Sequence, residues 1–398
     1  MSKLSYMEKL LDGVEVEWRA LRDVVKTITA PAKLKRESYR EAGQTPIIDQ
    51  GEKFITGYTD EDVKALPLGE YVIFGDHSEH IKYVDFSFIQ GADGLKILKS
   101  ISDNPKYVYY SFLNFYQKEL NYKRHWARAS ETLIPIPCPD NPEKSLAIQS
   151  EIVQILDKFT ALTAELTAEL TAELNMRKKQ YNYYRDKLLS FDEGEVEYLP
   201  MGDERVGEFI RGGTFQKKDF TDFGVGCIHY GQIYTYYGTY TNTTKTFISE
   251  SLARKCRKAE SGNLIIATTS ENDDDVCKAV AWLGYDDIAV SGDACIYKHK
   301  LNPKYVSYFF QTECFQRQKK QYITGAKVRR VNASNLAQIL IPVPSPEEQA
   351  RIVAILDKFE LLTNSITEGL PREIELRQKQ YEYYRDLLLS FPKSDEAA

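Results

Sequence analysis

Apolar residues recur at helical spacing along two long stretches of the chain. In residues 142–190, and again in 346–391, Leu, Ile, Phe and Tyr stand three, four or seven positions apart. Such a stripe covers one face of an amphipathic helix, and two long stripes in one chain can bury each other. The pattern therefore predicts two long helices that form an antiparallel coiled coil.

Local signals predict where these helices begin and where the second is interrupted. Asn-Pro at 141–142 and Ser-Pro at 345–346 each place a capping side chain before a proline at the first helical position. Gly369 and Pro371 occur in the second stretch only, and both residue types are poorly tolerated inside a helix. We therefore expect the two helices to differ near these residues.

The segments before and between the helices differ from them in character. Residues 12–133 and 192–340 are richer in Gly, Thr, Tyr and β-branched residues, which favour strands and turns. The expected fold class is α/β, with two mixed α/β heads joined by the two long helices. The expected boundaries are 1–140 for the first head, 141–191 for the first helix, 192–345 for the second head, 346–391 for the second helix and 392–398 for a flexible tail.

Four sequence blocks occur twice in the same order. They are NPKYV at 104–108 and 302–306, the proline-rich IPIPCP at 134–139 and IPVPSP at 341–346, ILDKF at 155–159 and 355–359, and QYNYYRDKLLSF at 180–191 with QYEYYRDLLLSF at 380–391. The opening of the chain from Tyr6 to Trp18 also resembles Tyr183 to Tyr198, at the end of the first copy. The repeat is therefore circular and predicts pseudo-twofold symmetry, with two variable heads on two nearly identical helices.

Composition narrows the class of protein. The length of 398 residues suits two domains. Six scattered cysteines without a C-x-x-C pair disfavour a metal site and predict reduced thiols, and with no leader-like apolar segment we expect a cytoplasmic protein. No Walker A motif, adenine methyltransferase motif or glycine-rich cofactor loop occurs in the sequence, so we expect no catalytic residues on this chain.

Basic residues gather in places that the net charge of −6 conceals. Arg and Lys can neutralise DNA phosphates or bind guanine, and neighbouring aromatic rings can pack on sugars or bases. A run of charge is as often a solvated surface, but two of these runs occupy corresponding positions in the two heads. The acidic loop 271–275 is expected to face away from phosphate. The candidate DNA-binding residues are Lys33, Lys35, Arg36, His77, Lys123, Arg124, His125 and Arg128 in the first head, and Lys217, Lys218, Arg317, Lys320, Lys327, Arg329 and Arg330 in the second.

The repeated blocks, their circular order and the tandem LTAELTAELTAEL at 162–174 resemble the specificity subunit of a Type I restriction-modification system, in the EcoR124-like group. The resemblance covers the whole architecture. It implies that each head binds one half of a bipartite double-stranded DNA target, and that two modification subunits and the restriction subunits join this chain. It also implies that S-adenosylmethionine, ATP and Mg are bound by those partners, with no cofactor on this chain.

Aromatic residues of the repeated blocks are candidates for contact with the modification subunits, although they could equally pack the coiled coil. They are Phe159, Tyr181, Tyr184, Phe359, Tyr381 and Tyr384. An alternative function is a non-catalytic coiled-coil adaptor with two protein-binding heads, which the acidic net charge favours. An enzyme with an unrecognised active site is the weakest interpretation.

The TAEL tandem places leucines four residues apart, which drifts from the 3.6-residue period of a helix. Its glutamates also stack at i, i+4, where only the pair of Glu173 with Arg177 offsets the repulsion. Packing alone would not select this repeat. Together with the resemblance, it indicates a spacer that sets the distance between the heads.

Deletion of Thr171 to Leu174 should shorten the non-specific gap in the DNA target. One unit adds about 6 Å to a helix, compared with ~3.4 Å per base pair. A slanted arm should therefore shift the gap by one to two base pairs, and the resemblance favours one. Mapping of methylated sites in cells tests this: both half-sites should persist, and an unchanged gap or altered half-sites would refute the spacer hypothesis.

Overall fold

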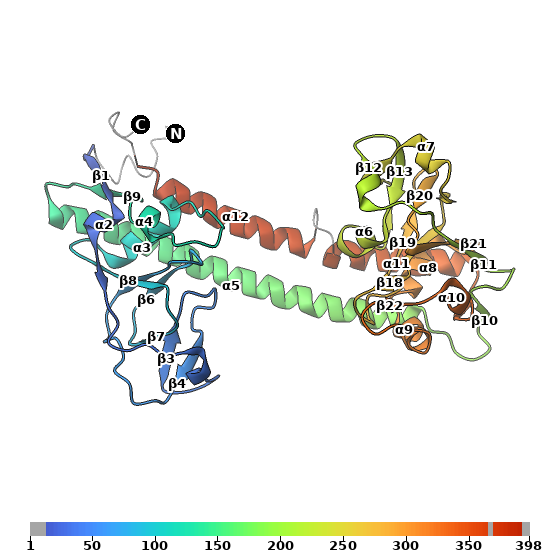
Figure 1. Cartoon of the computed structure of the whole chain (residues 1–398), viewed down its shortest axis with the longest axis horizontal. Helices are drawn as coiled ribbons and strands as arrows, with labels where there is room; N and C mark the ends of the chain where they lie inside the picture. The colour runs from blue at the N-terminus through green and yellow to red at the C-terminus, as the bar shows by residue number, and fades with distance from the viewer. Residues whose placement is uncertain (1–12, 365–368, 392–398) are drawn as a thin grey trace. The chain divides into compact units, whose positions relative to one another are not determined.

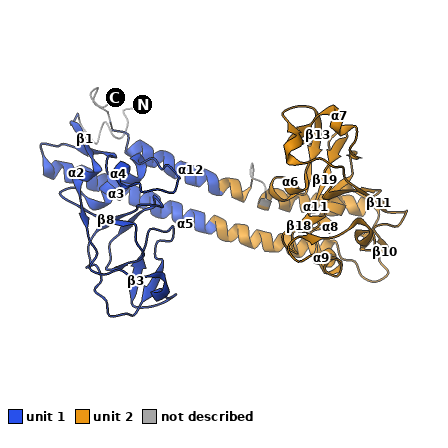
Figure 2. Ribbon diagram, viewed as in Figure 1, with its two compact units in different colours: residues 1–169, 374–398 blue, residues 170–373 orange. Residues whose placement is uncertain are grey.

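The computed structural model describes residues 13–364 and 369–391. The expected tail at 392–398 and the chain opening before Gly13 lie outside these residues. The chain divides into two compact units, residues 1–169 with 374–398 and residues 170–373 (Figure 2). Each unit therefore combines one head with parts of both long helical regions.

Unit 1 contains a mixed α/β head built on two small sheets. Their strand orders are β2-β8-β5-β6 and β4-β3-β7, and β1 pairs separately with β9 (Figure 1). The elements are β1 (Val16–Ala20), α2 (Leu21–Val24), β2 (Val25–Ile28), a 3-10 turn η1 (Arg36–Ser38), β3 (Thr45–Ile48), β4 (Gly57–Thr59), β5 (Tyr71–Gly75), β6 (Ile81–Val84), β7 (Ile89–Gln90), β8 (Leu95–Ser100), α3 (Pro105–Phe115), α4 (Trp126–Ala129), β9 (Leu133–Pro137) and the first part of α5 (Pro142–Leu188).

Unit 2 contains a larger head with two five-stranded sheets. Their orders are β11-β21-β17-β19-β14 and β12-β15-β13-β20-β16, and β10 pairs with β23 and β18 with β22. The strands are β10 (Glu197–Pro200), β11 (Gly207–Arg211), β12 (Phe220–Thr221), β13 (Val225–Ile228), β14 (Tyr240–Thr241), β15 (Thr246–Ile248), β16 (Lys258–Ala259), β17 (Leu264–Ala267), β18 (Thr269–Ser270), β19 (Ala279–Trp282), β20 (Ile288–Val290), β21 (Ala294–His299), β22 (Arg329–Arg330) and β23 (Leu340–Val343). The helices are η2 (Lys217–Asp219), α6 (Tyr230–Thr235), α7 (Glu250–Ala253), α8 (Pro303–Phe309), α9 (Glu313–Lys320), α10 (Ala333–Leu336) and α11 (Pro346–Asn364). A further helix, α12 (Leu370–Leu388), begins in unit 2 and continues into unit 1.

The long helices begin where the sequence predicts. The amide of Lys144 donates to Asn141 Oδ1 (3.1 Å), and the amide of Glu348 donates to Ser345 Oγ (3.3 Å), so both capping residues bind the first turn. Helix α5 ends at Leu188, three residues before the expected boundary at 191. The expected interruption of the second helix is confirmed, because α11 and α12 are separate helices and Gly369 has a φ of +81°.

The circular repeat is confirmed by strand register. In unit 1, Trp18 of β1 pairs with Pro135 of β9. In unit 2, Tyr198 of β10 pairs with Pro342 of β23. The segments that match in sequence thus form the same antiparallel pair, although one lies near the start of the chain and the other in its middle.

The predicted burial of one helix stripe against the other is also confirmed within each unit. In unit 1 the ring of Phe159 on α5 stacks on Tyr384 of α12, with centroids 5.2 Å apart and planes 12° apart. In unit 2 the ring of Phe359 on α11 stacks on Tyr184 of α5, at 5.6 Å and 26°. The start of each repeated block therefore packs against the end of the other block.

In unit 1, the head is attached to α5 through the N-terminus of α3. The buried side chain of Gln149 accepts a hydrogen bond from the amide of Asn104 (2.8 Å). Asp157 binds Lys106 Nζ (2.8 Å) and accepts a hydrogen bond from the Tyr110 hydroxyl (2.7 Å). These contacts hold a helix of the head along the first half of α5.

In unit 2, α8 is attached to α11 by the same set of contacts. Gln349 accepts from the amide of Asn302 (2.8 Å). Asp357 binds Lys304 Nζ (2.7 Å) and accepts from the Tyr308 hydroxyl (2.6 Å). The two units therefore share one docking contact between a head helix and a long helix, which we call the head clamp, although their heads have different sheets.

The TAEL section of α5 is less buried than the two ends of the helix. Ile152 and Leu156 are fully buried, and Tyr181 and Leu189 nearly so, whereas Leu162 is 52% exposed and none of the other TAEL leucines is fully buried. The predicted pairing of Arg177 with Glu173 is present, at 3.2 Å. None of the helices in the described residues is long and apolar enough to cross a membrane.

Replacement of Gln149 by Ala should destabilise the chain. The change removes the acceptor for the Asn104 amide and the donor that reaches Asp103 Oδ1 and Ser145 Oγ. Each buried polar group left without a partner costs about 1–3 kcal/mol. Urea unfolding of the full chain measures the loss of unfolding free energy. The control is Lys144→Ala, which changes an exposed side chain on the same helix. Equal stability of the two variants would contradict the role of the clamp.

Candidate nucleic-acid interface

In the first head, the structure brings together three predicted segments that are distant in sequence. Gln50 connects them: its Nε2 donates to Asp93 O (3.1 Å), and its Oε1 accepts from the amide of His77 (3.2 Å). Asp93 also binds Lys33 Nζ (3.0 Å), and His77 Nδ1 lies 3.1 Å from Lys123 O. Lys33, His77 and Lys123 therefore belong to one connected region of the head.

The remaining basic candidates of this head are mostly exposed. Lys35 and Arg36 are exposed at the 3-10 turn η1. Arg124 is exposed at the end of the loop that precedes α4. Such side chains can contact DNA phosphates without first leaving a buried site.

Two of the predicted basic residues share a carboxylate. Glu119 binds Lys123 Nζ (2.6 Å) and Arg128 NH1 (2.5 Å). The hydrogen bonds from Lys123 and Arg128 lower the pKa of Glu119 to about 2. Both cations are more than half exposed and remain accessible, but part of their charge is already neutralised.

His125 was expected to contact DNA, and the structure corrects this. Its side chain is fully buried, with Nε2 2.9 Å from Asn121 O and Nδ1 facing the carboxylates of Glu79 (3.4 Å) and Glu119 (3.2 Å). A ring with no exposed surface cannot contact DNA. The basic run in the sequence does not distinguish His125 from its exposed neighbours, because its acidic partners lie elsewhere in the chain.

In the second head, the turn between β20 and β21 connects the candidate segments. Ser291 Oγ accepts from the Tyr230 amide (2.9 Å), and Gly292 O accepts from Arg211 Nε (3.3 Å). Asp293 lies 3.8 Å from Arg330. Lys217 lies close to Gly231 and His229, which follow β13. Burial lowers the pKa of His229, Lys217 lowers it further, and Asp293 opposes the shift. Lys218 is exposed beside Lys217 on η2.

The basic segment near the end of the second head is partly neutralised. Arg317 and Lys320 are exposed on α9, and Lys327 is exposed in the hairpin that follows. Arg329, however, binds Asp273 (2.7 Å) in the acidic loop 271–275. The acidic loop therefore lies directly against the basic segment and neutralises part of its charge.

Lys319, which lies between Arg317 and Lys320 in this segment, is a structural residue. Its Nζ donates to the backbone carbonyls of Asp273 (2.8 Å), Asp274 (3.1 Å) and Val276 (2.9 Å). Burial lowers its pKa. The ammonium group therefore holds the acidic loop in place and offers no charge to a ligand.

The aromatic residues expected to contact a partner subunit all make contacts within the chain, although Tyr181 alone among them is buried. Tyr181 is buried and donates to Gln311 Oε1 (3.0 Å), and Tyr381 binds Thr160 Oγ1 (3.0 Å). Phe159, Phe359, Tyr184 and Tyr384 form the two stacked pairs described above. The tyrosines with the most accessible rings in these blocks are instead Tyr183 and Tyr383, which the sequence analysis did not select.

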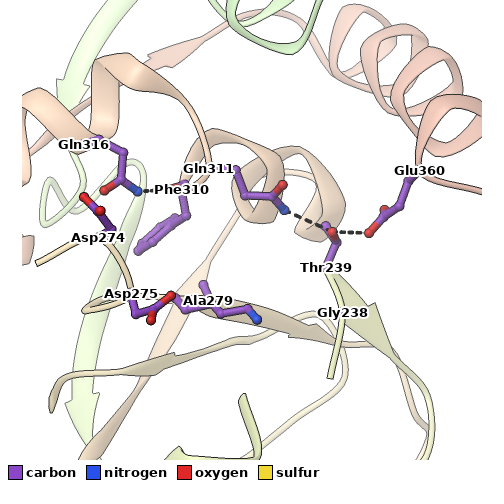
Figure 3. A pocket seen from close by; sticks show the side chains of 10 residues that line it. Gly238, Thr239, Asp274, Asp275, Ala279, Phe310, Gln311, Gln316 and Glu360 are labelled. Carbon is purple, nitrogen blue, oxygen red and sulfur yellow. Dashed lines mark hydrogen bonds between the residues drawn. The ribbon is translucent and has the colours of Figure 1, made fainter. Parts of the chain in front are cut away.

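A cavity of about 370 Å³ lies in unit 2 where the second head meets α11 (Figure 3). Thr239 donates to Glu360 of α11 and accepts from Gln311 Nε2 (3.0 Å), so hydrogen bonds cross this junction. Asp274 and Asp275 line the same cavity. Within the described ranges, no group of three or more His, Cys, Asp and Glu residues could hold a metal ion. We interpret the cavity as part of the joint between head and helix.

Comparisons with known proteins define the class to which this architecture belongs. The family model described as "Type I restriction modification DNA specificity domain" matches residues 13–176 and 204–376, one match in each half. The chain is 45% identical over 413 aligned positions to the EcoR124I/EcoR124II specificity subunit of Escherichia coli, and 99% of each chain is covered. It is 33% identical to the EcoprrI specificity subunit of E. coli, with 92% of this chain and 93% of the relative covered.

A solved structure supports the fold. One chain of a structure described as the complex assembly and conformational transition of the type I R-M system aligns with a TM-score of 0.61 and 13% identity, over 94% of this chain and 97% of that chain. The family-model match and the sequence identity show that the chain belongs to the family of type I restriction-modification DNA specificity proteins.

The adjacent residues Lys319 and Lys320 should separate stability from DNA binding. Lys319→Met should lower the free energy of unfolding by about 1–3 kcal/mol for each carbonyl left without a donor. Lys320→Met should change it by less than about 0.5 kcal/mol, but should reduce the slope of log affinity against log salt by about 0.9 if this side chain binds one phosphate. Thermal unfolding and DNA titrations at several salt concentrations test both variants, and the reverse pattern would contradict the assignment.

Proposed function

We propose that this chain is the sequence-specific DNA-binding subunit of a type I restriction-modification complex. Each head binds one half of a bipartite target, and the long helices fix the gap between the halves. The observation that carries this proposal is the head clamp: two heads with different sheets are held on the long helices by the same contacts. That arrangement lets the recognised sequence vary while the attachment of each head stays constant.

The chemistry of the complex is assigned to its partners. The relatives are named as specificity subunits of restriction enzymes. We infer that this chain likewise assembles with two modification subunits and with restriction subunits, and that it is not itself catalytic. S-adenosylmethionine, ATP and Mg are then bound by those partners, and the complex acts in the cytoplasm, where cellular DNA is accessible.

The exposed cations are suited to binding DNA phosphates, which positions the protein on the duplex. Phosphate contacts from Lys and Arg set the register of a protein on the duplex, whereas contacts to base edges specify sequence. Exposed candidates such as Lys35, Arg36 and Arg124 in the first head, and Arg317 and Lys327 in the second, lie outside the observed ion pairs. They can bind phosphate without breaking a contact within the chain.

Footprinting tests this function. The chain, purified with its cognate modification subunit, should protect two short sequence-specific tracts on one duplex, separated by a gap of fixed length. Scrambling one tract should abolish protection of that tract and weaken the whole complex. Raising the salt concentration should weaken binding steeply, because released counterions contribute to affinity.

The same preparation distinguishes other functions. Failure to retain any DNA at moderate salt would contradict the proposal and favour a protein-binding adaptor. A single protected tract would contradict the assignment of one half-site to each head. Methyl transfer by the isolated chain would contradict its non-catalytic role.

A further inference from the structure

The loop before α4 in the first head displays two apolar side chains to solvent. Leu120 is 85% exposed and Tyr122 is 91% exposed. Single exposed apolar residues are common on protein surfaces and need no explanation by themselves. Here they share a loop with the exposed cations Lys123 and Arg124, and that loop is held in one conformation by buried groups.

A buried carboxylate anchors the start of the loop. Glu79 accepts hydrogen bonds from the Tyr116 hydroxyl (2.6 Å), the Glu119 amide (2.9 Å) and the Leu120 amide (2.8 Å). Burial acts to raise the pKa of Glu79, but these hydrogen bonds outweigh it and the pKa falls below its usual value. Glu79 therefore stays ionised and binds the backbone that carries Leu120.

Two residues of this arrangement have an unfavourable backbone conformation. Glu79 has a φ of +57° and Leu120 a φ of +56°, in the left-handed region that residues with a side chain rarely adopt. Such conformations persist where surrounding contacts enforce them, and they occur often at binding sites. The contacts of Glu79 supply that enforcement for Leu120.

The end of the loop is fixed as well. Asp76 Oδ1 accepts from the amides of His125 (3.0 Å) and Trp126 (2.8 Å), which begin α4. The buried ring of His125 contacts Asn121 O (2.9 Å) inside the loop. Both ends of the segment that carries Leu120 and Tyr122 are therefore tied to buried groups.

Tyr122 itself is oriented by His77. The two rings stack with centroids 5.3 Å apart and planes 19° apart. His77 is held in turn by Gln50, through its amide, and lies against Lys123 O. A nearly fully exposed aromatic ring is thus held in a defined orientation before any ligand binds.

We infer that Leu120 and Tyr122 form the base-reading tip of the first head, and that they contact thymine methyl groups in the major groove of one half-site. This inference rests on the proposed function. The thymine methyl is the apolar group that base pairs present in the major groove, and apolar side chains are its natural partners. Lys123 and Arg124, next in the loop, bind the flanking phosphates. Glu79 is a positioning residue, because it acts through the backbone of the loop.

The second head provides an internal comparison. The segment between α8 and β23 occupies the same place in the repeat, and the buried ammonium of Lys319 holds a neighbouring loop there. Its hairpin turns at Gly325, with a φ of +89°, and displays Val328 beside Lys327. Because the two heads use different loops, a change at Leu120 or Tyr122 should affect one half-site and leave the other unaltered.

The test replaces thymine by deoxyuridine, which lacks only the methyl group. The complex of the full chain with its modification subunit is first used to locate both half-sites by footprinting. Duplexes with one thymine at a time replaced are then titrated with the wild type, Leu120→Ala, Tyr122→Ala and, as control, Tyr285→Ala at a fully exposed tyrosine of the second head.

We expect deoxyuridine to lower the DNA affinity of the wild type but not that of Leu120→Ala or Tyr122→Ala. At one or more positions of a single half-site, deoxyuridine should weaken binding by the wild type and by Tyr285→Ala about fourfold, the value of one buried methyl group. Leu120→Ala or Tyr122→Ala should bind thymine and deoxyuridine equally there. The inference would be overturned if deoxyuridine weakened binding equally in all four proteins, or if it did not weaken binding by the wild type. It would also be overturned if the half-site bound by the first head contained no A·T pairs.

The variant Glu79→Gln tests the positioning role separately. It should reduce the discrimination between thymine and deoxyuridine at the half-site that Leu120 contacts. The sequence discrimination at the other half-site should remain. Weakening of both half-sites together with a lower unfolding temperature would instead show a purely structural role and overturn it. If the wild type forms no bipartite footprint at all, the proposed function fails, and that result is distinct from any outcome of the deoxyuridine series.

Discussion

The structure depends on the head clamp, in which the N-terminus of one short helix is bound by a glutamine and an aspartate of a long helix. In unit 1 the buried Gln149 completes the hydrogen bonding of the turn that begins α3, and Asp157 neutralises Lys106 while binding a buried tyrosine. Because the side chains of Gln149 and Tyr110 are buried, their polar groups need these partners in place. The clamp therefore fixes the head along the long helix as well as stabilising it.

Neither half of the amino-acid sequence forms a unit by itself. Unit 1 needs α12 from the end of the chain, where Leu388 and Leu389 join the same core as Ile134 and Ile152. Unit 2 needs the end of α5, where Tyr181 and Leu189 join the core with Ile352. The circular order of the repeat follows from this exchange, since each block attaches a head with its start and supports the other block with its end.

The sequence predicted the features that depend on period and local chemistry. Helix starts at Asn141 and Ser345, the break near Gly369 and the pairing of the two stripes all follow from spacing and propensity.

The sequence did not predict features whose burial depends on segments distant in the chain. Nothing next to Lys319 indicates that its ammonium binds carbonyls of residues 273–276. The acidic partners of His125 are likewise absent from its immediate neighbours. No sequence pattern indicated the role of Glu79, because it binds backbone amides about forty residues further along the chain.

A specificity protein has to combine rigid presentation with freedom to change its sequence. Loops carry the variation most easily, but a mobile loop loses affinity when it becomes ordered on binding. The two heads meet this constraint with buried charges of opposite sign, a carboxylate at Glu79 that accepts amide hydrogen bonds and an ammonium at Lys319 that donates to carbonyls. A buried ion is tolerated only when hydrogen-bond partners or an opposite charge satisfy it. Most partners of these two ions are backbone groups, so each ion also enforces the loop conformation that supplies them. Because these anchors use backbone atoms, the side chains displayed by the loops can vary without disturbing the anchor or the head clamp.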